Sequence, residues 1–310
     1  YIMYSLLLAL IYLAFISLGL PDALLGSAWP VMYPLLGVSV SSAGIISMII
    51  AGGTIVSSLN ANRVIRKFGT GLVTAVSVLM TAVALFGFST SHSFWMLCLW
   101  AVPYGLGAGA VDSALNNFVA LHYASRHMSW LHCMWGVGAT ISPLIMGANL
   151  RGSMGWPGGY RMVALLQGIL FVILLISLPW WRRAEKKDPL ASAGEKHISN
   201  RNALRTPGLM TAMAAFACFV GFEAIAGVWA ATFLEGRKGF DPASAAFLAS
   251  LYYLGTTLGR AVSGLVAIKV DSRRLIRWGC FLATLGAVLL ALPLPRPFSL
   301  AAYILLGLGN

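Results

Sequence analysis

Charged residues are scarce in this chain of 310 residues: they make up 10% of it, against 59% for hydrophobic residues. A soluble domain of this length does not need so much apolar surface, because a single core stops growing near this size. Apolar runs of about 20 residues recur along the chain, and each can cross about 30 Å of hydrocarbon as a helix. The composition therefore predicts an all-α protein that spans a membrane many times.

Cysteine is also scarce, and its placement argues against several kinds of site. The four cysteines form no CxxC pair, so neither a disulfide framework nor a zinc site is indicated. His122, His127 and His132 recur at intervals of five, which does not stack them on one helical face, so we expect no metal. The sequence has no Gly-rich phosphate loop and no usable nucleophile–base pair, so we expect neither a cofactor nor an enzyme.

Ten apolar segments are predicted to be helices, and they are rich in Gly and Pro, as close-packed membrane helices are. The first has no basic leader, so we expect a spanning helix rather than a cleaved signal. The last is expected to be incomplete. The segments are 4–35, 40–61, 70–90, 93–122, 127–149, 160–181, 207–234, 242–268, 274–293 and 297–310.

Lys and Arg residues lie mostly in the loops, and unequally on the two sides. Loops on the same side as the N-terminus hold fifteen of them, and loops on the opposite side hold five. Such a bias marks the cytoplasmic side, so we expect a cytoplasmic N-terminus, in a bacterial inner membrane. The net charge of +12 is spread over these short loops, so no nucleic-acid partner is expected.

The longest polar stretch, residues 182–206, separates six predicted helices from the next four. Its many charges predict a solvated cytoplasmic linker. The linker divides the chain into an N-terminal six-helix bundle, residues 1–181, and an incomplete C-terminal bundle, residues 207–310.

The two halves share a repeat. An acid, Ala, an aliphatic residue, any residue and Gly follow one another from Asp22 to Gly26, and again from Glu223 to Gly227, 201 residues later. Gly53-Thr54 matches Gly255-Thr256 at an offset of 202. A parallel repeat of this kind predicts two bundles related by a pseudo-two-fold axis along the membrane normal, with a site between them near mid-depth.

This architecture resembles the major facilitator superfamily. The family's basic loop after its second helix has a partial match in 62–71, where Arg66 and Lys67 lie before Gly69 but the usual Asp is missing. A second partial copy, 264–274, contains Asp271 and Arg273. The resemblance implies that these residues gate the cytoplasmic side, as a latch that charge pairs hold closed.

Within the superfamily, three stretches resemble the fucose–galactose–gluconate proton symporters and their fucose-permease-like relatives. They are Gly-Leu-Pro-Asp22, the segments around Asp112 and around His132, and Gly-Phe-Glu223 with Trp229. In those symporters, acids in helices 1 and 4 couple proton and sugar movement, and Asp22 and Asp112 occupy similar places.

Asp22, Asp112 and Glu223 are acids inside apolar segments, where a charge costs several kcal/mol and normally persists for a pathway, a relay or a partner. We therefore expect them to couple protons to transport, with a hydrogen-bonded structural acid as the alternative at each position. Arg260, the single cation inside such a segment, is expected to pair with Glu223 or another acid, or to snorkel.

Polar and aromatic residues near these acids are candidates for substrate binding. Asn116 shares a helical face with Asp112, and a His beside an indole, as in His132 and Trp135, can form a sugar platform. Packing and helix–helix bonding are the alternatives for each. The full set is Asn116, Asn117, His132, Trp135, Gln167, Trp229 and Tyr253.

The sequence thus predicts a monomeric secondary transporter that moves a monosaccharide or small polyol by alternating access and couples this movement to protons. Because no Walker-type phosphate loop is present, we expect no ATPase motor in the chain itself. Two alternatives remain open. One is a drug–proton exporter of the same fold, and the other is a membrane receptor that binds its ligand without transporting it.

Overall fold

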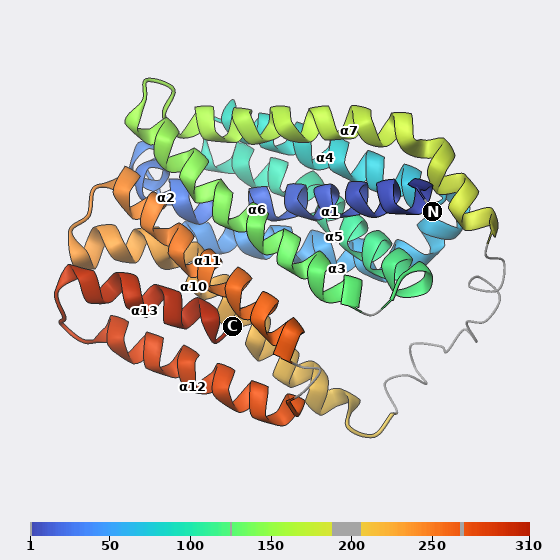
Figure 1. The fold of residues 1–310 in the computed structure, drawn as a ribbon. Helices are drawn as coiled ribbons and strands as arrows, with labels where there is room; N and C mark the ends of the chain where they lie inside the picture. Colours follow the sequence, from blue (N-terminus) through green and yellow to red (C-terminus); the bar gives the residue numbers. More distant parts are fainter. Residues whose placement is uncertain (1, 125, 188–205, 267–269) are drawn as a thin grey trace.

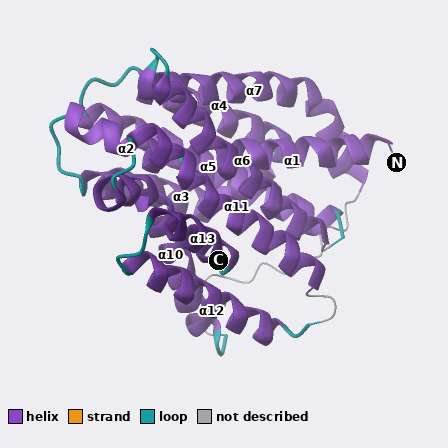
Figure 2. Cartoon of the chain, turned by 60° about the vertical axis from the view of Figure 1, so that its left-hand side comes forward, coloured by secondary structure: helices purple, strands orange, loops and turns teal. Residues whose placement is uncertain are grey.

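The computed structural model describes residues 2–124, 126–187, 206–266 and 270–310. Throughout these ranges the chain forms helices and no strands (Figures 1 and 2). In chain order they are α1 (Ile2–Asp22), α2 (Leu24–Leu35), α3 (Ser42–Phe68), α4 (Thr70–Ser89), α5 (Phe94–His122), α6 (Arg126–Arg151), α7 (Gly155–Lys187), α10 (Leu209–Lys238), α11 (Pro242–Val266), α12 (Ser272–Ala291) and α13 (Arg296–Leu308). Within the described residues, eight spans, one of them α1 and α2 together, are long and apolar enough to cross a membrane.

The predicted segments correspond to these helices, with one difference of substance. The segment 4–35 is divided at Ala23 into α1 and α2, directly after Asp22. Pro21 lies in the last turn of α1 and has no N–H to donate, which weakens the helical hydrogen bonds at this point. Of the predicted linker, residues 188–205 lie outside the described part of the chain, as do residues 267–269 of the second loop copy.

Close helix crossings in the N-terminal half depend on glycine. At Gly19 of α1, an added Cβ would overlap the backbone oxygen of Trp135 in α6, and at Gly138 of α6 it would overlap that of Ile16. Small residues at such crossings let two backbones approach closely in a membrane. These contacts fix α6 against α1 just where both helices carry candidate site residues.

The repeat seen in the sequence is also present in the packing. Gly53 brings α3 against the backbone of α5 at Gly105, and its counterpart Gly255 brings α11 against the backbone of α13 at Gly307. In the same way α4 packs on α5, and α12 packs on α13. The two halves therefore use the same helix pairs, as expected for the predicted fold of two related bundles.

The halves meet through α2 and α10, α2 and α11, and α6 and α11. Gly26 of α2 lies against the backbone of Gly227 and Val228 in α10, so close that a Cβ would come within 2.6 Å of the Gly227 oxygen. Helix α2 lies at the end of the molecule opposite the N-terminus (Figure 1). Backbone-to-backbone packing at Gly26 thus joins the two halves at the start of this helix.

Candidate functional site

A cavity of about 640 Å³ lies between the two halves. The N-terminal half lines it from α1, α3, α5 and α6, and the C-terminal half lines it from α10 and α11. On α6 and α10, which both begin on the side of the molecule that holds the N-terminus, the lining residues all belong to the first half of the helix. The cavity therefore extends from mid-depth toward that side. The lining residues are Phe15, Leu18, Asp22, Ile50, Thr54, Ala108, Asp112, Ser129, His132, Trp135, Phe216, Phe219, Val220, Glu223, Arg260, Ser263 and Asn310.

Asp22 is held at the wall of this cavity by two neutral donors. The Tyr104 hydroxyl donates to one carboxylate oxygen at 2.6 Å, and the Trp135 indole nitrogen donates to the other at 2.7 Å. The break between α1 and α2 places the side chain at the cavity surface, where it is exposed. Both donors are uncharged, and within the described part of the chain the carboxylate has no ion-pair partner.

Glu223 and Arg260 form an ion pair across the cavity wall, from α10 to α11. The distance between Arg260 Nη2 and Glu223 Oε1 is 2.6 Å, and the two side chains are 19% and 17% exposed. The structure thus places Arg260 beside Glu223, the first of the partners that the sequence suggests for it. The pair neutralises one of the three cavity acids.

Trp135 is already engaged on both its polar edge and its ring face. Its N–H is donated to Asp22, and the Arg260 guanidinium lies 4.7 Å from the ring centroid. A cation at this distance is attracted by the ring. The indole therefore differs from the open sugar platform that the sequence suggests, because a sugar would have to displace Arg260 to reach this face.

Asp112 also lines the cavity, and Asn116 supports it from one turn further along α5. The Asn116 amide nitrogen donates to the Asp112 carboxylate at 2.9 Å and to its backbone oxygen at 3.0 Å. His132 lines the cavity with its ring edge-on to Phe15, with 5.8 Å between the centroids. Asn116 itself does not line the cavity.

Four other predicted binding residues lie outside the cavity lining. Gln167 is buried and donates its amide N–H to the Ser17 backbone oxygen at 2.8 Å. Tyr253 is buried in the C-terminal core, and Trp229 packs on the apolar cluster around Trp29, because α10 continues unbroken through Gly227. Asn117 is half-buried.

The predicted gating residues are exposed at helix ends. Arg66 and Lys67 end α3, Asp271 precedes α12, and Arg273 lies in its first turn. In place of the missing loop Asp, Glu185 of α7 accepts a hydrogen bond from the Thr70 backbone N–H at 2.7 Å, at the start of α4. An acid from α7 thus anchors the loop that the resemblance assigns to the latch.

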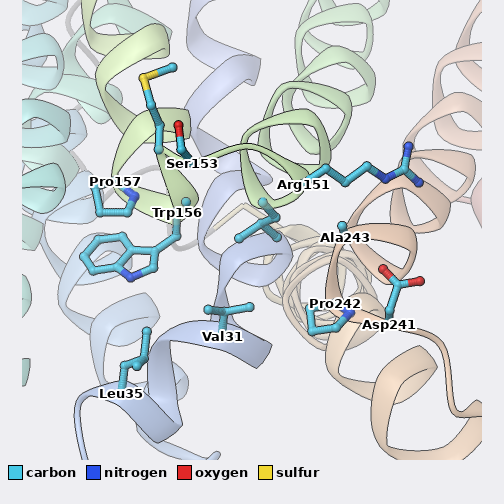
Figure 3. A pocket seen from close by; sticks show the side chains of 12 residues that line it. Val31, Leu35, Arg151, Ser153, Trp156, Pro157, Asp241, Pro242 and Ala243 are labelled. Carbon is cyan, nitrogen blue, oxygen red and sulfur yellow. The ribbon is translucent and has the colours of Figure 1, made fainter.

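A second cavity of about 500 Å³ lies at the opposite end of the molecule (Figure 3). Arg151, which ends α6, and Asp241, which precedes α11, both line it, so it brings opposite charges from the two halves to one place. Trp156 forms part of its wall. In the described ranges, no group of three or more His, Cys, Asp or Glu residues could hold a metal ion.

Comparisons with known proteins agree on the kind of fold. The sequence pattern of the Major Facilitator Superfamily matches residues 11–310. Among curated proteins, "Bypass of stop codon protein 6" of Saccharomyces cerevisiae is 22% identical over 279 residues, which cover 81% of this chain and 55% of the yeast protein. The chain therefore spans about half the length of that relative.

Solved structures with this architecture include variants of two transporters. A nucleoside transporter, NupG, matches with a TM-score of 0.73 at 16% identity, over 97% of this chain and 78% of its own. A peptide transporter, POT, in complex with alafosfalin matches with the same TM-score at 15% identity, over 97% of this chain and 79% of its own. Likenesses at this level of identity show the fold.

Proposed function

This chain belongs to the Major Facilitator Superfamily, and from that premise we propose that it is a proton-coupled secondary transporter of a monosaccharide or small polyol. The observation that carries the proposal is the composition of the central cavity. Asp22, Asp112 and Glu223, drawn from both halves, meet there at mid-depth with one cation, Arg260. Charges at this depth are costly and mark pathways or proton relays.

Alternating access supplies the transport cycle. Residues 1–181 and 207–310 are the two units that rock about the site, joined by 182–206. The cavity extends toward the N-terminal end, while α2 and α10 close the other end. With the N-terminus in the cytoplasm, this arrangement is open inward, in the membrane of a bacterial cell.

A neutral hydroxylated cargo suits the polar part of the cavity. Hydroxyl, imidazole and carboxylate groups line it, from Thr54, Ser129, His132, Ser263 and Asp112. Such groups exchange hydrogen bonds with sugar hydroxyls. The similarity to the fucose-permease-like group supports the same substrate class.

Uptake of labelled hexoses and polyols into energised vesicles tests the proposal, after a thermal-shift panel has selected a ligand. We expect accumulation that an uncoupler abolishes, and an Asp22→Asn variant that exchanges the cargo across the membrane without accumulating it. Accumulation that is insensitive to the uncoupler would exclude proton symport.

A drug–proton exporter is the second candidate, because one wall of the cavity is apolar. Phe216, Phe219 and Val220 of α10 form this wall, which would accept the apolar body of a drug. Drug susceptibility of cells that express the protein distinguishes the two functions. Raised resistance without sugar uptake would favour the exporter.

A further inference from the structure

A continuous series of contacts links an acid of the N-terminal half to an ion pair of the C-terminal half. It runs from Asp22 on α1 to Trp135 on α6, then across the interface to Arg260 on α11 and Glu223 on α10. The three contacts measure 2.7 Å, 4.7 Å and 2.6 Å. Among the described residues, Trp135 is the one side chain whose contacts reach both the acid and the ion pair.

An indole is well suited to this position because it offers two different interactions at once. Its edge carries an N–H that can only donate, and its face attracts a cation. Trp135 uses the edge for Asp22, in its own half, and the face for Arg260, in the other half. Tyr104 is the matched comparison, since it donates to the same carboxylate but, among the described residues, makes no hydrogen bond to the second half.

We propose that Trp135 is a positioning residue that transmits the protonation state of Asp22 to the Glu223–Arg260 pair. The inference rests on the proposed proton coupling and assigns the step that joins the two halves. A proton from cavity water binds a carboxylate oxygen of Asp22, and that oxygen then carries an O–H in place of a free lone pair. Tyr104 and Trp135 then share one strong acceptor oxygen and one weak one in place of two strong ones. The hydrogen bond that holds the indole weakens, so the ring against which Arg260 packs is held less firmly.

Other groups near Asp22 could also respond to its protonation. Besides Tyr104 and Trp135, the acids Asp112 of α5 and Glu223 of α10 and the hydroxyl of Tyr253 on α11 lie near enough to interact with it electrostatically. Arg260 is held by Glu223 and by the indole face. We call the series Asp22–Trp135–Arg260–Glu223 the relay. Variants at Trp135 and Arg260 interrupt it, and so distinguish its effect from that of a general change in the charge around Asp22.

The first experiment needs no cargo. Infrared titration of the purified protein follows the band of protonated carboxylic acid, with Asp22→Asn identifying the Asp22 contribution. Trp135→Phe keeps a ring beneath Arg260 but removes the N–H, and Tyr104→Phe removes the other donor. Because each donor favours the ionised carboxylate, we expect both variants to move the midpoint up by about one pH unit, a tenfold change in proton affinity.

The second experiment separates the two donors. With Cys218 and Cys280 replaced by serine, a cysteine at Ser129 in the cavity reports opening through its labelling by a membrane-impermeant maleimide. We expect the labelling rate to change at least threefold between pH 5 and pH 8 in the parent protein and in Tyr104→Phe, with a shifted midpoint in the latter. In Trp135→Phe the rate should be insensitive to pH.

Arg260→Lys tests the relay from its other end. It takes the place of Trp135→Phe if that variant does not fold. We expect its infrared midpoint to match the parent, because the Asp22 contacts are intact, while its labelling rate no longer responds to pH. Identical behaviour of Trp135→Phe and Tyr104→Phe, or a parent protein whose labelling ignores pH, would overturn the relay. If the parent moves no sugar or polyol, the proposed function fails, while these cargo-free measurements still decide the role of Trp135.

Discussion

At the scale of single residues, replacing Arg260 is expected to have the clearest effect on folding stability. Replacing it by Gln leaves Glu223 without its cation at the cavity wall. Removing one member of a fully buried pair costs roughly 3–5 kcal/mol, and this pair is partly exposed, so we expect about 2 kcal/mol of lost stability. Thermal unfolding in detergent measures it.

The double variant Arg260→Gln with Glu223→Gln is the control, because it removes both charges together. We expect it to recover most of the stability that the single variant loses. Equal destabilisation by the single and double variants would show that Arg260 acts through packing on Trp135 rather than through its charge.

The same residues show how far the sequence predicts the site. Three acids and one Arg inside apolar segments are conspicuous because charge there is costly, and all four line the cavity. Tyr104 gave no such signal, since a tyrosine in an apolar helix resembles any packed aromatic and its partner Asp22 lies 82 residues away. Gln167 gave a false signal for the cavity, because a buried amide can equally serve a backbone oxygen, here that of Ser17.

At the scale of helices, the crossing of α2 and α10 leaves no room for a side chain at Gly26. A Cβ there would lie 2.6 Å from the Gly227 oxygen and 2.8 Å from Val228 Cα, so one backbone must move. We expect Gly26→Ala to loosen this end of the interface and to raise the reactivity of a cysteine placed at Val31, in the second cavity.

Gly44→Ala is the matched control, because a Cβ at Gly44 in α3 meets nothing within 4 Å. Its helical position predicts a small gain in stability, up to about 1 kcal/mol, with no change in Val31 cysteine labelling. Equal labelling in both alanine variants would show that the Gly26 crossing does not hold this end closed.

Asp241 stabilises the start of α11 and faces Arg151 across the second cavity. Its carboxylate accepts from the Ser244 backbone N–H at 3.0 Å. Hydrogen bonds from Ser244, and then the charge of Arg151, hold the pKa of Asp241 below its ordinary value. An acid with a lowered pKa stabilises the folded state above about pH 4 and loses that contribution as the pH falls further.

We therefore expect Asp241→Ala to cost about 1 kcal/mol at neutral pH, as lost helix caps do, and the difference from the parent to shrink below pH 4. Unfolding curves at several pH values measure this. Asp241→Asn keeps a capping oxygen without the charge, so any loss of folding stability in that variant reports the lost attraction between Asp241 and Arg151.

Helix positions followed from hydropathy almost throughout, because apolar length alone identifies a membrane span. The division at Ala23 did not. Gly19, Pro21 and Gly26 predict a bend in this segment. The residue at which the helix breaks depends on how α6 and α10 pack against the segment. Tertiary contacts of this kind have no local pattern in the sequence.

At the scale of the whole molecule, the charge bias predicts sidedness that labelling can test. With Cys218 and Cys280 replaced by serine, a cysteine at exposed Ser153, in the α6–α7 turn, should react with an impermeant maleimide added outside intact cells. A cysteine at exposed Arg182 should react only after permeabilisation. The reverse pattern would invert the proposed orientation and the direction in which the cavity opens.

Gly26 and Gly227 touch one another and are also each other's counterparts in the repeat. A point that maps onto its own neighbour under a two-fold rotation lies beside the rotation axis, so this contact is a natural fulcrum. From Gly227 back to the start of α10 is about 27 Å of helix at about 1.5 Å per residue. A tilt of about 10° at the fulcrum therefore sweeps the far end of that lever through about 5 Å, enough to open or shut the mouth of the cavity with almost no sliding where the halves touch.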